Sequence, residues 1–185
     1  MNKYVLQWPT LGFTWSESDH ALFYYGGIQE AVSKVRIRCL IGWHVDDGMA
    51  TLNSQPFLEK VKKQISGRFG IKDLGPVSKY LGVQFEQDRA AHKIWMHQSE
   101  YITFLLQEYN LADCSLVRLP ADLNAPLDDP SGQYPEVTNL CSVYLKIVGE
   151  LIYLSVNTHP DISYIVNALA QHNVNPKPRH FTSAK

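Results

Sequence analysis

The sequence predicts an α+β fold, in which an antiparallel sheet with a packed helix is followed by a mainly helical half. Between residues 35 and 45, apolar and polar side chains alternate, as in a strand with one buried face. Between residues 57 and 69, apolar side chains recur every three or four positions, as they do between 140 and 154. That spacing is typical of amphipathic helices, so strands dominate the first half of the chain and helices the second.

The first strands lead to a pair of aspartates. A short strand is expected at Ala21–Tyr25, and the alternating strand ends at Asp46 and Asp47, before Gly48 and a second apolar run over residues 49–52. This order predicts a β-hairpin with both carboxylates at its turn. Adjacent like charges repel each other and need water, a cation or a cationic partner, and Mg²⁺ prefers such oxygen ligands. Good turn chemistry alone explains the same residues, so both interpretations stay open here.

One helix and two strands are expected between residues 54 and 97. Pro56 suits the first turn of a helix and Gly70 suits its end. The lysines off the apolar stripe of this helix form either a solvated surface or a basic face. Residues 80–86 alternate as a strand, and Lys93–Met96 is the expected return strand after a polar turn.

The second half is expected to be helical on both sides of an irregular linker. A helix should run from Ser99, as its cap, to about residue 110, with Phe104 among its inward side chains. Residues 112–137 contain four prolines and many acids, as in a linker. Residues 138–156 form the most amphipathic helix, and another starts at Pro160 and ends at residues 176–180, with no element after it.

The composition is that of a folded intracellular protein. Of 185 residues, 45% are hydrophobic, and the net charge is −1, which counts mildly against an autonomous nucleic-acid binder. Cys39, Cys114 and Cys141 are odd in number and far apart, which predicts reduced, buried thiols. No apolar run is long enough to cross a bilayer, and no signal-peptide core follows the first residues. We therefore expect a cytoplasmic protein that is not secreted and has no membrane partner; its oligomeric state is not indicated.

Several short stretches along the chain occur in a recognisable order. They are Gly12-Phe13 with Leu22-Phe23, Trp43-His44-Val45-Asp46-Asp47, Phe69-Gly70-Ile71-Lys72-Asp73-Leu74-Gly75, Tyr80-Leu81-Gly82-Val83, Gln98 with Tyr101-Ile102, Val148-Gly149-Glu150-Leu151-Ile152-Tyr153-Leu154 and Thr158-His159-Pro160-Asp161-Ile162. In this order they resemble the reverse transcriptase of copia-type LTR retrotransposons, over nearly the whole chain. The hairpin is similar to the Tyr-Val-Asp-Asp motif of that family, with His44 in place of its tyrosine.

The resemblance implies a role for each matched residue. Asp46 and Asp47 would be catalytic, as two of three carboxylates that hold two Mg²⁺ ions for nucleotidyl transfer. His44 would pack against the primer terminus or the incoming nucleotide, and Lys72 would approach the triphosphate. Leu81-Gly82 resembles the hairpin that grips the primer. The implied partners of the intact enzyme are an RNA or DNA primer–template and deoxynucleoside triphosphates.

The resemblance also implies two domains and an incomplete enzyme. Residues 1–97 would form a partial palm with primer-grip-like strands, and residues 98–185 the thumb and the start of the connection towards ribonuclease H. The third aspartate belongs to a motif that we do not find, since Asp19 matches a different family position. We therefore expect a fragment that is inactive alone, binds Mg²⁺ weakly or not at all, and leaves the strand at residues 35–43 at an open sheet edge.

Two alternatives remain from the sequence. One is a non-catalytic relic of a transposable element that binds nucleic acid or a partner, for which we expect salt-dependent affinity for primer–template without a need for Mg²⁺. The other is the product of a decayed reading frame that does not fold stably.

Overall fold

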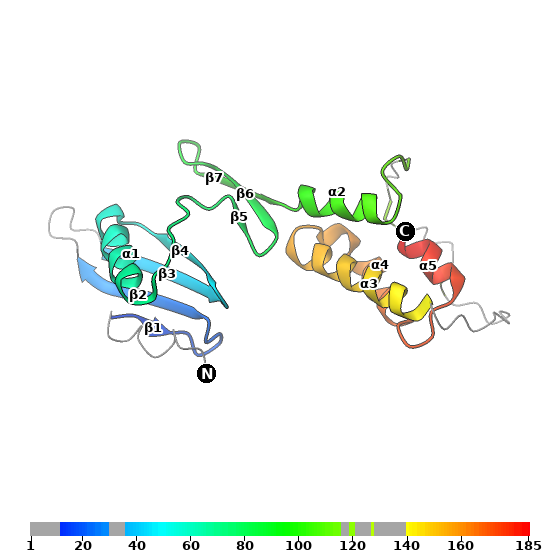
Figure 1. Cartoon of the computed structure of the whole chain (residues 1–185), viewed down its shortest axis with the longest axis horizontal. Coiled ribbons are helices and arrows are strands. Elements are labelled where there is room, and N and C mark those ends of the chain that lie inside the picture. Colours follow the sequence, from blue (N-terminus) through cyan, green and yellow to red (C-terminus); the bar gives the residue numbers. More distant parts are fainter. Residues whose placement is uncertain (1–11, 30–35, 116–118, 121–126, 128–139) are drawn as a thin grey trace. The chain divides into compact units, whose positions relative to one another are not determined.

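The structure is a computed structural model that describes residues 12–29, 36–115, 119–120, 127 and 140–185 (Figure 1). The chain divides into two compact units, Met1–Tyr80 and Leu81–Lys185. Antiparallel strands and helices occur in both, which confirms the predicted α+β class. The assignment of residues 1–97 to a palm and 98–185 to a thumb stays a prediction.

The first unit contains a four-stranded antiparallel sheet in the order β1-β2-β3-β4. Ile41 of β3 lies opposite Phe23 of β2 on one side and Ala50 of β4 on the other. The predicted open edge at residues 35–43 is therefore wrong, because the preceding segment forms a full strand beside it, longer than the expected Ala21–Tyr25. The strands are β1 (Thr14–Trp15), β2 (Leu22–Gln29), β3 (Arg36–His44) and β4 (Asp47–Leu52).

Helix α1 (Gln55–Phe69) covers one face of this sheet (Figure 1). Ser54 caps it by accepting a hydrogen bond from the Phe57 amide at 3.4 Å, and Gly70 ends it in the left-handed conformation at φ 63°. Both ends are as predicted. Alternate side chains of the strands and the apolar stripe of α1 form the core: Phe13, Phe23, Cys39, Ile41, Val61 and Ile65.

The second unit begins with a turn and a β-hairpin. Strand β5 (Lys79–Tyr80) ends the first unit, and β6 (Val83–Asp88) pairs antiparallel with β7 (Lys93–His97) in the second. The return strand is confirmed, but the continuous strand predicted over residues 80–86 is wrong at Leu81 and Gly82. Both residues have positive φ, 47° and 80°, which a strand does not permit and a two-residue turn requires.

Helix α2 (Ser99–Glu108) follows β7. Ser99 is its first helical residue, and Gln98 occupies the cap position without a side-chain capping bond, so the predicted cap is wrong. Leu105 is buried, but Phe104, which we expected to face inward, is 53% exposed. The predicted linker after α2 has no helix or strand in its described residues, and the rest of it lies outside the described part.

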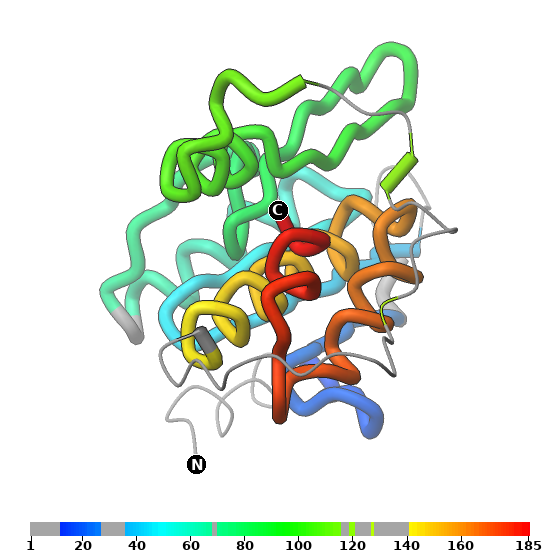
Figure 2. The backbone as a smooth tube through the Cα atoms, turned by 90° about the vertical axis from the view of Figure 1, so that its right-hand side faces the viewer, coloured from blue at the N-terminus to red at the C-terminus, as the bar shows by residue number. Residues whose placement is uncertain are grey.

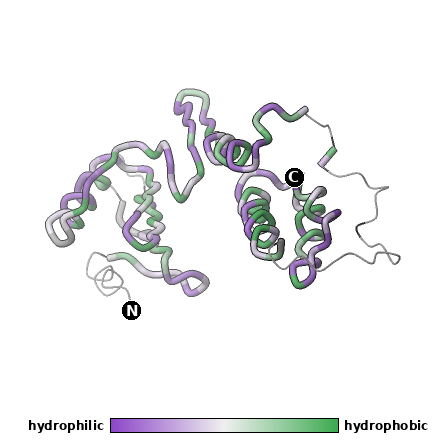
Figure 3. Tube along the Cα trace, turned by 45° about the vertical axis from the view of Figure 1, so that its right-hand side comes forward, coloured by the Kyte–Doolittle hydropathy of each residue, from purple (hydrophilic) through white to green (hydrophobic). Residues whose placement is uncertain are grey.

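The remaining helices of the second unit pack together, as Figure 2 shows in yellow, orange and red. They are α3 (Leu140–Asn157), the short 3₁₀ turn Pro160–Ile162, α4 (Ser163–Ala170) and α5 (Pro178–Ala184). The predicted stripe of α3 is buried at Tyr144, Ile147 and Leu154, and hydrophobic residues are frequent along this helix (Figure 3). Tyr144 donates a hydrogen bond to the Leu169 carbonyl of α4 at 2.8 Å.

The expectation that no element follows residue 180 is wrong. Pro178 starts α5, because proline suits the first position of a helix. This helix buries His180 in the cluster around Tyr144. The thiols are also less uniform than predicted, since Cys39 is buried but Cys114 is exposed; all three cysteines are free. No helix in the described residues is long and apolar enough to cross a membrane.

Candidate functional site

The two aspartates lie at the tip of the β3–β4 hairpin. Strand β3 ends at His44, Val45 and Asp46 form the turn, and Asp47 begins β4. Both aspartates are exposed, as the sequence predicted. The indole N–H of Trp43 donates to the Val45 carbonyl at 3.0 Å and ties the turn to the end of β3.

The hairpin separates its side chains between the two faces of the sheet. Trp43 lies opposite Gly48, and a Cβ at Gly48 would overlap the Trp43 ring, so the ring packs directly on the β4 backbone. His44 lies opposite Asp47 in the next pair. Since strand side chains alternate, His44 and Asp47 share the face away from α1.

The carboxylates of Asp46 and Asp47 have no partner among the described residues. Three other aspartates, in loops or at a strand end, accept a backbone N–H locally: Asp19 from Ala21 at 2.8 Å, Asp73 from Gly75 at 2.9 Å and Asp88 from Ala91 at 2.9 Å. Aspartates that serve only to bend the chain make such bonds. The hairpin pair makes none within the described part, nor an ion pair with lysine or arginine there.

Tyr80 is near this pair and was not predicted. Burial raises the pKa of its phenol, and the negative charge of Asp47 raises it further. Tyr80 is far from the hairpin in the sequence, and no spacing pattern relates the two. Its proximity to Asp47 is therefore visible only in the folded structure. Among the described residues, no group of three or more histidine, cysteine or acidic side chains is placed to hold a metal ion.

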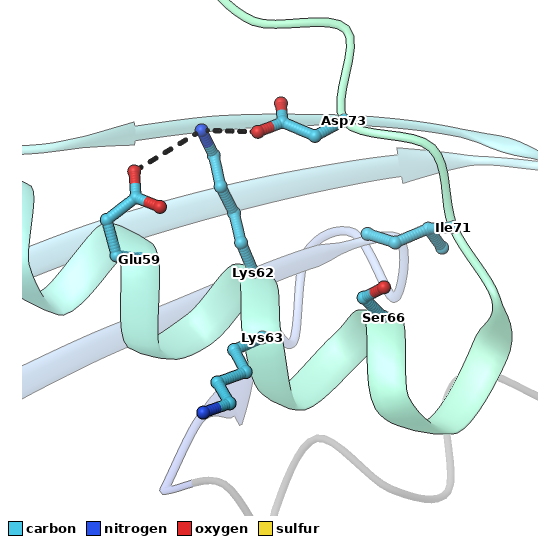
Figure 4. A pocket seen from close by; sticks show the side chains of 6 residues that line it. All are labelled: Glu59, Lys62, Lys63, Ser66, Ile71 and Asp73. Carbon is cyan, nitrogen blue, oxygen red and sulfur yellow. Dashed lines mark ion pairs between the residues drawn. The ribbon is translucent and has the colours of Figure 1, made fainter.

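Lys72 lies exposed in the loop after α1, in the same unit as the hairpin. Beside it, Lys62 of α1 contacts Asp73 at 2.8 Å and Glu59 at 3.7 Å (Figure 4). The hydrogen bond from Lys62 lowers the pKa of Asp73, and the same bond raises the pKa of Lys62. Lys62 thus contacts the loop that carries Lys72.

A shallow depression of about 360 Å³ adjoins this ion pair. Its lining residues are Glu59, Lys62, Lys63, Ser66, Ile71 and Asp73, as Figure 4 shows. It includes none of the predicted site residues. The first unit therefore brings His44, Asp46 and Asp47 together, with Lys72 on a separate loop, while Leu81 and Gly82 belong to the second unit.

Residues 10–122 match the family described as reverse transcriptase (RNA-dependent DNA polymerase). Over its whole length the chain is 33% identical to the retrovirus-related Pol polyprotein from transposon RE1 of Arabidopsis thaliana, of which it covers 12%. It is 30% identical over 145 residues, 77% of its length, to the Pol polyprotein from transposon TNT 1-94 of Nicotiana tabacum, of which that region covers 11%. An uncharacterized mitochondrial protein of Arabidopsis thaliana is 32% identical over 77% of the chain, which is 56% of that protein.

The chain thus spans about a tenth of the length of these Pol polyproteins and about half of the mitochondrial protein. No solved structure matches it significantly. The family match covers more than half of the chain and includes the aspartate hairpin, the Lys72 loop and the Leu81–Gly82 turn. The predicted resemblance is confirmed: the chain belongs to the reverse transcriptase (RNA-dependent DNA polymerase) family of copia-type retrotransposons.

Proposed function

We propose that the chain supplies the metal-holding hairpin and a primer-contacting turn to a copia-type reverse transcriptase. The observation that carries this proposal is the exposed Asp46–Asp47 pair, which no described N–H group or basic side chain neutralises. The reaction joins a deoxynucleoside triphosphate to the 3′-hydroxyl of a primer on an RNA or DNA template, and pyrophosphate leaves. His44, on the same sheet face as Asp47, would contact the primer end or the incoming nucleotide, and Lys72 the triphosphate.

The hairpin offers ligands of the type that Mg²⁺ prefers, but it offers too few of them. Carboxylate oxygens are the hard ligands that Mg²⁺ prefers, but two carboxylates cannot complete an octahedral shell. The remaining oxygens would come from substrate phosphates, from water and from a further carboxylate of the polymerase. We therefore propose that the chain alone binds divalent cations weakly and adds no nucleotides.

A divalent-cation titration tests the hairpin. Mg²⁺ or Mn²⁺ should bind the wild-type chain weakly, and Asp46→Asn should abolish that binding. Asp88→Asn is the matched control, because Asp88 ends a strand at the β6–β7 hairpin but accepts the Ala91 amide; it should bind as the wild type does. Divalent binding that Asp46→Asn leaves unchanged would contradict the proposal.

A primer-extension assay tests catalysis separately. With a primed RNA or DNA template, deoxynucleoside triphosphates and Mg²⁺, we expect no product above background. Extension that disappears in Asp46→Ala would overturn the proposed inactivity while supporting the role of the carboxylate.

Nucleic-acid binding without catalysis is the second candidate. It is favoured by the sheet face away from α1, on which Tyr24 is 46% exposed and Arg36 and Arg38 are also exposed. A tyrosine ring can stack on a base, and arginines neutralise phosphates. Affinity for primer–template that falls with salt but does not depend on Mg²⁺ would support this candidate over the first.

A further inference from the structure

We propose that Tyr153 of α3 is a positioning residue that holds the Leu81–Gly82 turn in shape for the primer. The positioning itself is a property of the free chain. Its effect on the primer rests on the proposed function above, which assigns this turn to primer contact.

The contact joins two segments that are far apart in the sequence but lie in one unit. The hydroxyl of Tyr153 donates a hydrogen bond to the backbone carbonyl of Leu81. A Cβ at Gly82 would lie 3.5 Å from Cζ of Tyr153 and nearer still to its hydroxyl oxygen. Gly82 therefore serves twice: it permits the positive φ of the turn, and it leaves room for the tyrosine to reach the adjacent carbonyl.

Tyr153 is itself held by its surroundings. Its ring packs edge-to-face against Tyr101 of α2, with 5.1 Å between centroids and 86° between planes. The same two helices are joined farther along by the Tyr109 hydroxyl, which donates to the Glu150 carboxylate at 2.6 Å. Aromatic pairs in this geometry and charge-assisted hydrogen bonds are both stabilising. The Leu81 carbonyl is thus tied to a fixed helix pair.

This arrangement decides what the turn presents to a ligand. The carbonyl of Leu81 is occupied by Tyr153, whereas the Leu81 residue is 45% exposed. A primer would therefore meet a turn whose backbone is fixed from behind by α3. Without the Tyr153 hydroxyl, the turn still contains Gly82, but it loses the hydrogen bond that holds the Leu81 carbonyl in one position.

Hydrogen exchange on the free chain tests the positioning. Tyr153→Phe removes only the hydroxyl and retains the ring that packs on Tyr101. Amide exchange at residues 81–83 should become about 3- to 10-fold faster, the factor expected for one lost hydrogen bond. Tyr109→Phe is the matched control, because it removes a hydroxyl between the same helices without touching the turn. It should leave exchange at residues 81–83 unchanged.

Binding of a primer end tests the consequence for function. We expect the wild-type chain to bind a duplex with a recessed 3′ end more tightly than a blunt duplex of the same length. Tyr153→Phe should reduce that preference about 3- to 10-fold at the same salt dependence, since no phosphate contact is lost. Tyr109→Phe should keep the preference.

These experiments test the positioning role of Tyr153 separately from the primer contact of the turn. Unchanged exchange at residues 81–83 in Tyr153→Phe would overturn the positioning role, and so would equal effects of both substitutions, which would indicate general loosening of the helix pair. A wild-type chain without preference for the recessed end would overturn the primer contact assigned to the turn. In that case the exchange measurement still supports or refutes the positioning by Tyr153.

Discussion

In the turn of the β3–β4 hairpin, Val45 has a backbone conformation that its own side chain disfavours. It has φ 51°, where a β-branched side chain meets the backbone, and it is 64% exposed, so packing does not compensate. Val45→Asn should raise the free energy of unfolding by about 1 kcal/mol, because asparagine tolerates positive φ. Urea denaturation measures this. Val174→Asn, at an exposed position without positive φ, should change stability little; equal effects at both positions would exclude backbone strain as the cause.

The two glycines of the hairpin have different surroundings. A Cβ at Gly48 would overlap the Trp43 ring, whereas a Cβ at Gly42 would meet nothing within 4 Å. We expect Gly48→Ala to lower the free energy of unfolding by about 1–3 kcal/mol, the cost of forcing a packed side chain aside. Gly42→Ala should be tolerated, since it adds a methyl group on the open face. Thermal unfolding of the two variants checks this, and equal stability would show that the Trp43 ring moves freely.

At the residue scale, the sequence predicted which candidate residues lie together where those residues are adjacent in the chain. His44, Asp46 and Asp47 follow one another, so the strand pattern and the turn chemistry alone place them together. Tyr80 and Tyr153 were missed because each reaches its partner only through the fold. Tyrosines at amphipathic spacing are indistinguishable in sequence from ordinary core residues.

At the scale of elements, α5 depends on one buried histidine. The ring of His180 accepts the Lys177 amide at Nδ1, at 3.0 Å, and donates from Nε2 to the Leu127 carbonyl, also at 3.0 Å. It stacks on His172, with 3.9 Å between centroids. Both bonds require the neutral ring with its proton on Nε2. Protonation would therefore remove the Nδ1 bond that starts the helix.

This geometry gives stability a defined pH dependence. Burial lowers the pKa of His180, and the charges of His172, Lys177 and Arg179 lower it further, against the opposing effect of the Leu127 carbonyl. Because the unfolded chain then binds a proton more readily, stability should fall as the pH drops below about 6.5, the ordinary histidine value. The fall should level off below the folded pKa. Unfolding midpoints at pH 7.5 and 5.5 should differ less in His180→Gln than in the wild type; an unchanged difference would assign the effect to other histidines.

The sequence predicted the bounds of an element best where the residues at its ends favour one conformation. Residues 54–70 have a capping serine, an early proline, an apolar stripe and a final glycine, and α1 has the predicted ends. The strand over residues 80–86 was predicted wrongly because Leu81 is an unusual residue at positive φ, so its apolar side chain suggested a continuous strand. Pro178 was predicted to end a helix, but it begins one, and proline is common in both places. The burial of His180, which the sequence does not show, distinguishes a helix start from a helix end here.

At the scale of the whole molecule, the first sheet has a six-residue edge strand, β4, and a partly apolar face. Among the described strands, β4 pairs only with β3, so the backbone groups on its other side are open for pairing. Tyr24 and Leu40 are exposed on the face away from α1, and Leu40 lies opposite Thr51 of β4. Open edges with apolar neighbours favour pairing between chains. We therefore expect the chain to self-associate at high concentration.

A single lysine on the edge strand should reduce this association. Thr51→Lys places a charge on β4 beside the exposed Leu40, where a second copy would have to bury it. Ser142→Lys is the matched control, because it adds the same charge on an exposed position of α3, which belongs to the other unit. Sedimentation velocity at increasing concentration should show larger species for the wild type and for Ser142→Lys, and fewer for Thr51→Lys. If both lysines reduce association equally, net charge and not the β4 edge controls it, and a monomeric wild type at high concentration would show that this edge is not open to pairing.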